Sequence, residues 1–258
     1  MWSYLSIWVN LAKREAMWWL SILALVGSWQ VQEADPFRYG FVVALYRNGA
    51  HICNGALYKH QVAMVPSICT YRHMSNAKVE LFRHDLSQTI EEETRRSYGL
   101  NSTAIYKAYP QSVDILAVHT TGELAFLKLD IQTEGGGGLW YQIYPGEKRP
   151  VLIGWTSHST RLSRTSLPTA ASNLCKLLPV FFTNKPFKLC FSESPTRSAE
   201  VKFKLGTPLV DFAGPNPKLI GLLLIQHQTT AGSSVAVALN TGLYAPAIES
   251  QIGLVFGI

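Results

Sequence analysis

The sequence lacks the charge patterns that accompany nucleic-acid binding or polybasic membrane binding. Only 16% of its 258 residues are charged, the formal net charge is +6, and no run of four or more lysines and arginines occurs. Such a scattered, mildly basic composition argues against a nucleic-acid partner. It is compatible with loose attraction to acidic glycans or acidic proteins. Hydrophobic residues make up 47% of the chain, which predicts a folded protein with a buried core rather than a disordered one.

The sequence also lacks an apolar stretch of the roughly 20 residues that a membrane-spanning helix needs. Its N-terminus has a shorter apolar run, residues 17–27, which follows Lys13 and Arg14 and ends at Gly27 and Ser28. A basic start, a short apolar centre and small residues at the end are typical of a secretory signal peptide. We therefore expect residues 1–28 to be a signal peptide with an approximate cleavage site. The protein should then be secreted and extracellular, with no membrane span.

Cysteine is scarce, with four residues and no Cys-x-x-Cys pair. Because no histidines stand near the cysteines at ligand spacing, we expect no metal site and no cofactor. An even number of cysteines in a secreted chain favours disulfides, and four cysteines allow three pairings. We expect the local pairing, Cys53–Cys69 and Cys175–Cys190, which closes one short loop in each half of the chain. The sequon at Asn101 predicts a glycosylated surface loop.

Short apolar, β-branched or aromatic runs of strand length fill the chain after residue 36, separated by Asn-Gly, Gly, Pro and Ser clusters. They fall into two groups, residues 41–129 and 150–240, which predicts two antiparallel barrels or a sandwich. The charged run EEETRR, residues 91–96, predicts a solvated loop or a hairpin tip.

Two further segments complete the predicted organisation. Residues 130–149 contain four consecutive glycines and predict a flexible connection between the groups. A phosphate-binding loop is a weak alternative, because no lysine or serine follows the glycines and no helix begins there. Residues 244–256 place Ile248, Ile252 and Val255 at helical spacing and predict a short C-terminal helix.

Seven blocks of the sequence resemble, in order, blocks of the chymotrypsin/trypsin-like serine protease family. They are HICNGALYKHQVAMVPSIC (51–69), VELFRHDLS (79–87), GELAFLKLD (122–130), VLIGW (151–155), KPFKLCFS (185–192), KLGTPLV (204–210) and NTGLYAPAIESQI (240–252). The family blocks that they resemble are HFCGGSLI…WVLTAAHC, VRLGEHDLS, NDIALLKL, VTGWG, MFCAG, DSGGPLV and PGVYTRVSSYLPWI.

The resemblance covers about residue 36 to the end and implies an all-β, trypsin-like domain over residues 36–258. Its expected parts are two six-stranded antiparallel β-barrels and a short C-terminal helix. The boundaries are about 36–130 for the first barrel, 131–149 for the linker, 150–243 for the second barrel and 244–256 for the helix.

The resemblance places unreactive side chains at the catalytic positions. In the family a serine attacks the substrate carbonyl, a histidine takes the serine proton, and a buried carboxylate orients the histidine. The histidine position matches Ile68 and the serine position matches Leu205, and neither side chain can do this chemistry. The carboxylate position matches Glu123. Phe203 matches the glycine that donates to the oxyanion, and Lys204 matches the aspartate that pairs with a new N-terminus, which a lysine would repel.

The strand that binds the substrate backbone in the family matches residues 224–226, where Gln226 replaces a glycine. Together these matches imply a secreted, catalytically inactive serine protease homologue, and not an enzyme. It would bind an extracellular protein (a protease, a substrate or an inhibitor) as a cofactor, decoy or regulator of proteolysis, for example in a reproductive or seminal secretion. Two alternatives stay open: an active serine-type endopeptidase, from family similarity, and a glycan-binding secreted protein, from the mild positive charge.

Overall fold

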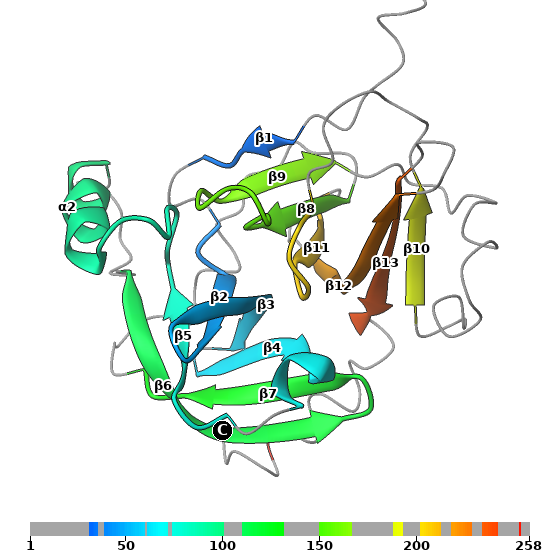
Figure 1. The fold of residues 1–258 in the computed structure, drawn as a ribbon, viewed down its shortest axis with the longest axis horizontal. Coiled ribbons are helices and arrows are strands. Elements are labelled where there is room, and N and C mark those ends of the chain that lie inside the picture. The colour runs from blue at the N-terminus through cyan, green and yellow to red at the C-terminus, as the bar shows by residue number, and fades with distance from the viewer. Residues whose placement is uncertain are drawn as a thin grey trace, which may run out of the picture.

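The structure is a computed structural model that describes the chain in eleven stretches. They are residues 31–35, 39–59, 61–71, 74–100, 110–131, 150–166, 188–192, 202–212, 218–228, 234–241 and 253. These residues form a closed barrel and a second antiparallel sheet beside it (Figure 1). Among them, no helix has both the length and the apolar character needed to cross a membrane.

The first half is a closed antiparallel barrel with strand order β2-β3-β4-β7-β6-β5. Alternate side chains of a strand point to opposite faces, and in β2 both faces are covered. Val43 and Leu45 pack inside the barrel, whereas Val42 and Ala44 pack with Trp155 of the second half. The barrel strands are β2 (Val42–Arg47), β3 (Ala50–Lys59), β4 (Val62–Pro66), β5 (Ala77–Leu81), β6 (Gln111–Thr121) and β7 (Leu124–Leu129).

The second half is a seven-stranded antiparallel sheet with strand order β1-β9-β8-β11-β12-β13-β10. Its strands are β1 (Gln32–Glu33), β8 (Val151–Gly154), β9 (Ser163–Ser166), β10 (Lys188–Ser192), β11 (Pro208–Asp211), β12 (Lys218–Gln228) and β13 (Ser234–Asn240). β1 lies before residue 36 in the sequence and pairs with β9 at the edge of this sheet. Glu33 helps to hold β1 through a hydrogen bond with His84 Nε2 at 3.1 Å and an ion pair with Arg161.

The predicted fold class is confirmed, since the described chain is mostly β with a closed six-stranded barrel and a second antiparallel sheet. Several expected features lie outside the described residues. They are the signal peptide (1–28), the sequon at Asn101, the glycine-rich connection (132–149) and the C-terminal helix (244–256).

One predicted loop is a helix, so the prediction of a solvated loop or hairpin tip at residues 91–96 is wrong. Helix α2 (Ile90–Leu100) begins with a capping box. The Glu92 amide donates to Thr89 Oγ1 at 3.2 Å, and the Thr89 amide donates to the Glu92 carboxylate at 3.0 Å. Acidic side chains in the first turn also favour the helix, because its N-terminus carries partial positive charge.

The two halves share a hydrophobic cluster. Met64 and Phe126 of the first barrel are fully buried in it, together with Leu222 and Leu239 of the second sheet. Of the residues that the sequence singled out, Phe203, Lys204 and Leu205 lie in the turn that precedes β11, and Ile68 lies in the short 3₁₀ helix η1 (Ser67–Thr70).

Candidate functional site

The turn at residues 203–207 is packed tightly against β3 of the first barrel. Gly206 has a φ of +82°, and its amide donates to the Leu223 carbonyl at 2.7 Å. The Asn54 amide donates to the Leu205 carbonyl at 2.8 Å. A Cβ atom at Gly206 would lie 2.0 Å from the carbonyl oxygen of Asn54, so only glycine fits here. The backbone of this turn is therefore fixed by contacts with both halves of the molecule.

The structure places the three expected catalytic positions around the end of the first barrel. Leu205 is partly buried and packs against the core cluster that contains Cys53 and Cys69. Ile68 lies in η1 directly before Cys69, and 66% of its surface is exposed. Glu123 is joined to η1 through a hydrogen bond from the Ser67 amide to its carbonyl at 2.8 Å. No side chain among these three is a general base next to a nucleophile.

A disulfide joins β3 to η1, as the sequence predicted. Cys53 and Cys69 are bonded to each other, with their Cα atoms 6.2 Å apart. Cys190, which lies on β10, is also disulfide-bonded. Cys175 lies outside the described residues, so its pairing with Cys190 stays a prediction.

The carboxylate of Glu123 forms an ion pair with a lysine from the other half of the molecule. Lys188 Nζ lies 3.1 Å from Glu123 Oε1, and only 5% of the Lys188 side chain is exposed. The pair joins the β6–β7 turn to the start of β10. No local pattern in the sequence singles out Lys188, because its partner lies 65 positions away in the other half of the molecule.

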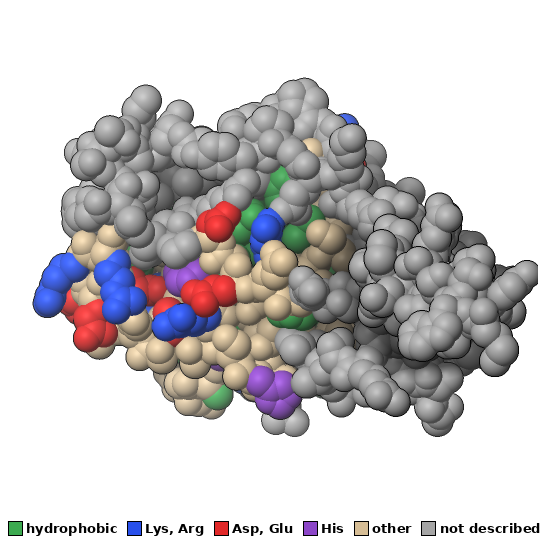
Figure 2. All heavy atoms as spheres, turned by 90° about the horizontal axis from the view of Figure 1, so that it is seen from above, with side chains coloured by type: hydrophobic (Ala, Val, Ile, Leu, Met, Phe, Trp, Pro, Cys, Tyr) green, Lys and Arg blue, Asp and Glu red, His purple; other side chains and the backbone are tan. Residues whose placement is uncertain are grey.

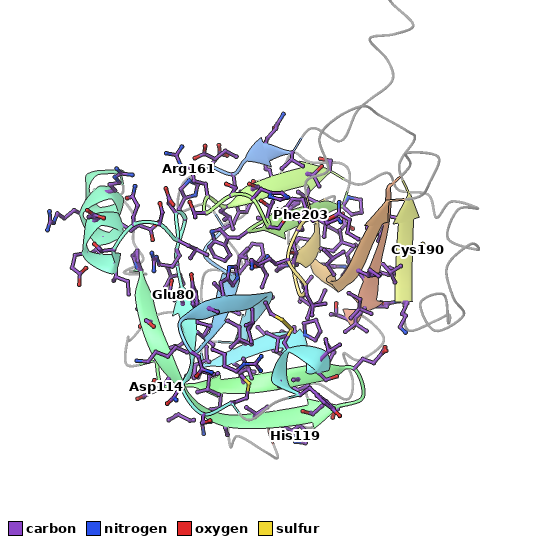
Figure 3. The ribbon with its side chains drawn as sticks, in the orientation of Figure 1. Glu80, Asp114, His119, Arg161, Cys190 and Phe203 are labelled. Atoms are coloured by element: carbon purple, nitrogen blue, oxygen red, sulfur yellow. A yellow bond between two sulfur atoms is a disulfide. The ribbon has the colours of Figure 1, made fainter. Side chains whose placement is uncertain are left out.

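The backbone amide of Phe203 is occupied by a side chain of the same chain. It donates to Gln226 Oε1 at 3.0 Å, and the Phe203 ring is buried in a cluster with Leu152, Leu209 and Leu223 (Figure 3). Phe203 also forms a β-bridge with Thr156. An amide that is already bonded to an amide oxygen is not available to stabilise an oxyanion.

The side chain of Lys204 points to β3. Its Nζ donates to the His51 carbonyl at 2.9 Å. The His51 ring stacks on Tyr46 with centroids 5.3 Å apart and meets the edge of Trp155 at 5.8 Å. Burial, followed by the nearby ammonium of Lys204, lowers the pKa of His51 to about 4, so the imidazole is neutral at pH 7.

Asn54 is a fully buried polar residue that the sequence analysis missed. Its Nδ2 donates to the Trp155 carbonyl at 3.0 Å and to Thr207 Oγ1 at 2.7 Å. Its Oδ1 lies 3.0 Å from His51 Nε2, which also lies 3.1 Å from the Cys53 carbonyl. Because both partners of Nε2 are oxygen acceptors, this nitrogen carries the ring proton.

No group of three or more His, Cys, Asp or Glu side chains is placed to hold a metal ion within the part of the chain that the structure describes. The described chemistry around the turn is instead hydrogen bonding, one ion pair and apolar packing.

Comparisons with known proteins identify the fold but no family. No family model matches the chain, and no curated protein matches it. The structure of human heparin binding protein is similar, with a TM-score of 0.61 and 17% identity over 86% of this chain and 96% of that chain. A mutant of the same human protein has a TM-score of 0.61 and 16% identity over 87% of this chain and 96% of that chain. An atomic-resolution structure of heparin binding protein has a TM-score of 0.60 and 17% identity over 86% of this chain and 96% of that chain. At these identities the likeness shows the fold alone, which is trypsin-like.

Proposed function

We propose that the protein is a secreted, catalytically inactive homologue of trypsin-like serine proteases. It acts by binding another extracellular protein, as a cofactor, decoy or regulator of proteolysis. The observation that carries this proposal is the turn at residues 203–207. Its backbone is held in place by Gly206, yet the side chain at the expected nucleophile position is Leu205, which has no nucleophilic atom.

The surroundings of the turn support the absence of catalysis. The amide of Phe203 is bonded to Gln226, so an oxyanion would have to displace it. The carboxylate of Glu123 is paired with Lys188 instead of an imidazole. Ile68 offers no nitrogen that could take a proton.

Exposed apolar side chains support a binding role. Ile68 and Tyr71 are 66% and 89% exposed in and just after η1, and Leu116 and Val118 are exposed on the adjoining strand β6. We call these four residues the η1–β6 surface. Large apolar side chains that gather on a surface are typical of protein interaction sites.

The absence of catalysis is tested with a serine-reactive phosphonate probe and a mixture of peptide substrates. The purified chain should neither take up the probe nor hydrolyse a peptide, and labelling at any serine would exclude the proposal. The control is the double variant Ile68→His with Leu205→Ser, which should fold because neither side chain is fully buried. Labelling of the new serine would show that the probe reaches this turn.

The binding role is tested with a photo-crosslinking residue at Tyr71 and a matched one at Ser157, which is exposed on the other half. Extracellular proteases, their substrates and their inhibitors are offered in turn. We expect one of them to crosslink through position 71 and not through position 157. Equal crosslinking at both positions would count against the η1–β6 surface.

Glycan binding is a second candidate, because the similar solved structures are those of a heparin binding protein. Charge counts against it. Lys78, Arg83, Arg161 and Lys188 are all paired with carboxylates. Figure 2 shows acidic and basic side chains intermingled on the described part of one face, with no continuous basic area there. Elution from heparin at salt well above 0.15 M would favour this candidate over protein binding.

A further inference from the structure

Lys204 connects the turn before β11 to the first barrel. The residue belongs to the second half, but its ammonium donates to the carbonyl of His51 on β3, at 2.9 Å. The backbone link next to it runs in the opposite direction, from the Asn54 amide to the Leu205 carbonyl. Side chain and backbone thus cross the boundary between the halves at the same point.

The acceptor on β3 is itself held in place. The His51 ring stacks on Tyr46 and makes a T-shaped contact with Trp155, and its Nε2 donates to the Asn54 side chain and the Cys53 carbonyl. The ring is uncharged at pH 7, so it does not repel the ammonium. The carbonyl that receives Lys204 therefore has little freedom to move.

Every residue of the turn has a hydrogen-bonding partner. The Phe203 amide donates to Gln226, the Lys204 amide to the Trp155 carbonyl at 3.1 Å, and the Gly206 amide to the Leu223 carbonyl. The Leu205 carbonyl accepts from Asn54, and Thr207 Oγ1 donates to the Lys204 carbonyl at 2.7 Å. The Lys204 ammonium adds the only charged group among these contacts, and charged donors make the stronger hydrogen bonds.

We infer that Lys204 is a built-in conformational lock, whose ammonium fixes the 203–207 turn in one conformation against the first barrel. The turn is then in its final shape as soon as the chain folds, and no further segment or ligand is needed to order it. This inference goes beyond the proposed function and does not depend on it, because it would hold for an active or an inactive chain.

The lock is tested by amide hydrogen exchange at pH 7 in Lys204→Met, which keeps the apolar stem and removes the donor. The amides of Asn54 and Gly206 should exchange at least about tenfold faster than in the wild type, as expected when a charged hydrogen bond is lost. The matched control is Lys202→Met, which changes an exposed lysine two residues earlier and should leave both amides unchanged. Unchanged exchange in Lys204→Met would overturn the inference.

A second measurement uses the wild-type chain, so it does not depend on a variant that folds. An amine-acylating reagent at low dose should modify Lys204 at least about tenfold more slowly than Lys218, which is exposed at the start of β12, because the bonded ammonium of Lys204 must first be released. Mass spectrometry of the digested protein gives both rates. Equal rates at the two lysines would overturn the lock, whatever the outcome of the crosslinking and labelling experiments on function.

Discussion

At the residue scale, Gly206 determines the backbone conformation of the 203–207 turn, and glycine is required there for two reasons. Its φ of +82° is strained for other residues, and a Cβ atom would lie 2.0 Å from a backbone oxygen of Asn54. Gly206→Ala should therefore lower the free energy of unfolding by about 2–4 kcal/mol, measured by urea denaturation. Gly49→Ala is the control, since Gly49 has a similar φ of +76° but no atom within 4 Å of the added Cβ. It should cost about 1 kcal/mol, and equal losses would contradict the predicted clash.

His51 makes stability depend on pH. Its pKa falls from 6.5 to about 4 on folding, mainly through burial and next through Lys204. Between these values the unfolded chain binds a proton that the folded chain does not. Stability is therefore complete above pH 6.5 and is lost as the pH falls towards 4, by up to about 3 kcal/mol. In urea denaturation from pH 7 to pH 4, the free energy of unfolding should fall less for His51→Phe than for the wild type. For His158→Gln, at an exposed position, it should fall with pH as steeply as in the wild type.

Among the site residues, those that the sequence could identify are the ones with local signals. The Cys53–Cys69 disulfide closes a short loop, and Glu123 stands in a recognisable block before a strand. Lys188 and Asn54 could not be identified in this way. Their partners Glu123 and Thr207 come from the other half of the molecule, so their roles arise only when the two halves meet.

At the scale of elements, a buried ion pair attaches α2 to the barrel. The Arg83 guanidinium donates to the carboxylates of Glu93 and Glu80 and to the Gln88 carbonyl, and Glu93 also accepts from the His84 amide at 2.9 Å. Arg83 and Glu93 are both buried, whereas the Lys78–Asp114 pair on β5 and β6 is exposed.

Arg83→Met should destabilise the fold by about 3–5 kcal/mol, because it leaves the Glu93 charge buried without its partner. Hydrogen exchange should rise first in α2 and in the segment that precedes it. Lys78→Met, which breaks the exposed pair, should cost less than about 1 kcal/mol. If urea denaturation gave similar losses of unfolding free energy for the two variants, the buried Arg83–Glu93 pair would not be what holds α2 to the barrel.

The same ion pair explains why α2 was not predicted. The capping box at Thr89 and Glu92 is visible in the sequence, but residues 91–96 have no apolar stripe, and a charged run is usually solvated. This helix is held by a buried carboxylate, Glu93, that cannot be told from its exposed neighbours by composition. Strand β9 likewise has no strand-like pattern in its sequence, since SRTS contains no apolar residue.

At the scale of the whole molecule, the sequence predicted the two groups of strands but not how they meet. Each group has the alternation and turn residues that specify antiparallel strands, such as the Asn48–Gly49 turn with its positive φ values. The pairing of β1 with β9 brings residue 32 beside residue 164, a contact that no local pattern encodes. The shared cluster of β4, β7, β12 and β13 likewise depends on which apolar faces remain uncovered once each sheet has formed.

This shared cluster should make the two halves unfold together. Phe126 is buried in it with Leu222 and Leu239 from the second sheet, so Phe126→Ala should lower the free energy of unfolding by about 3–5 kcal/mol. Hydrogen exchange should become faster in both β6 and β13, within a single cooperative urea transition. Leu116→Ala, at a mostly exposed position on β6, is the control and should change stability by less than about 0.5 kcal/mol. Two separate transitions, with only that of the first barrel shifted by Phe126→Ala, would mean that the halves are independent domains and that the Lys204 and Glu123 contacts between them contribute little to stability.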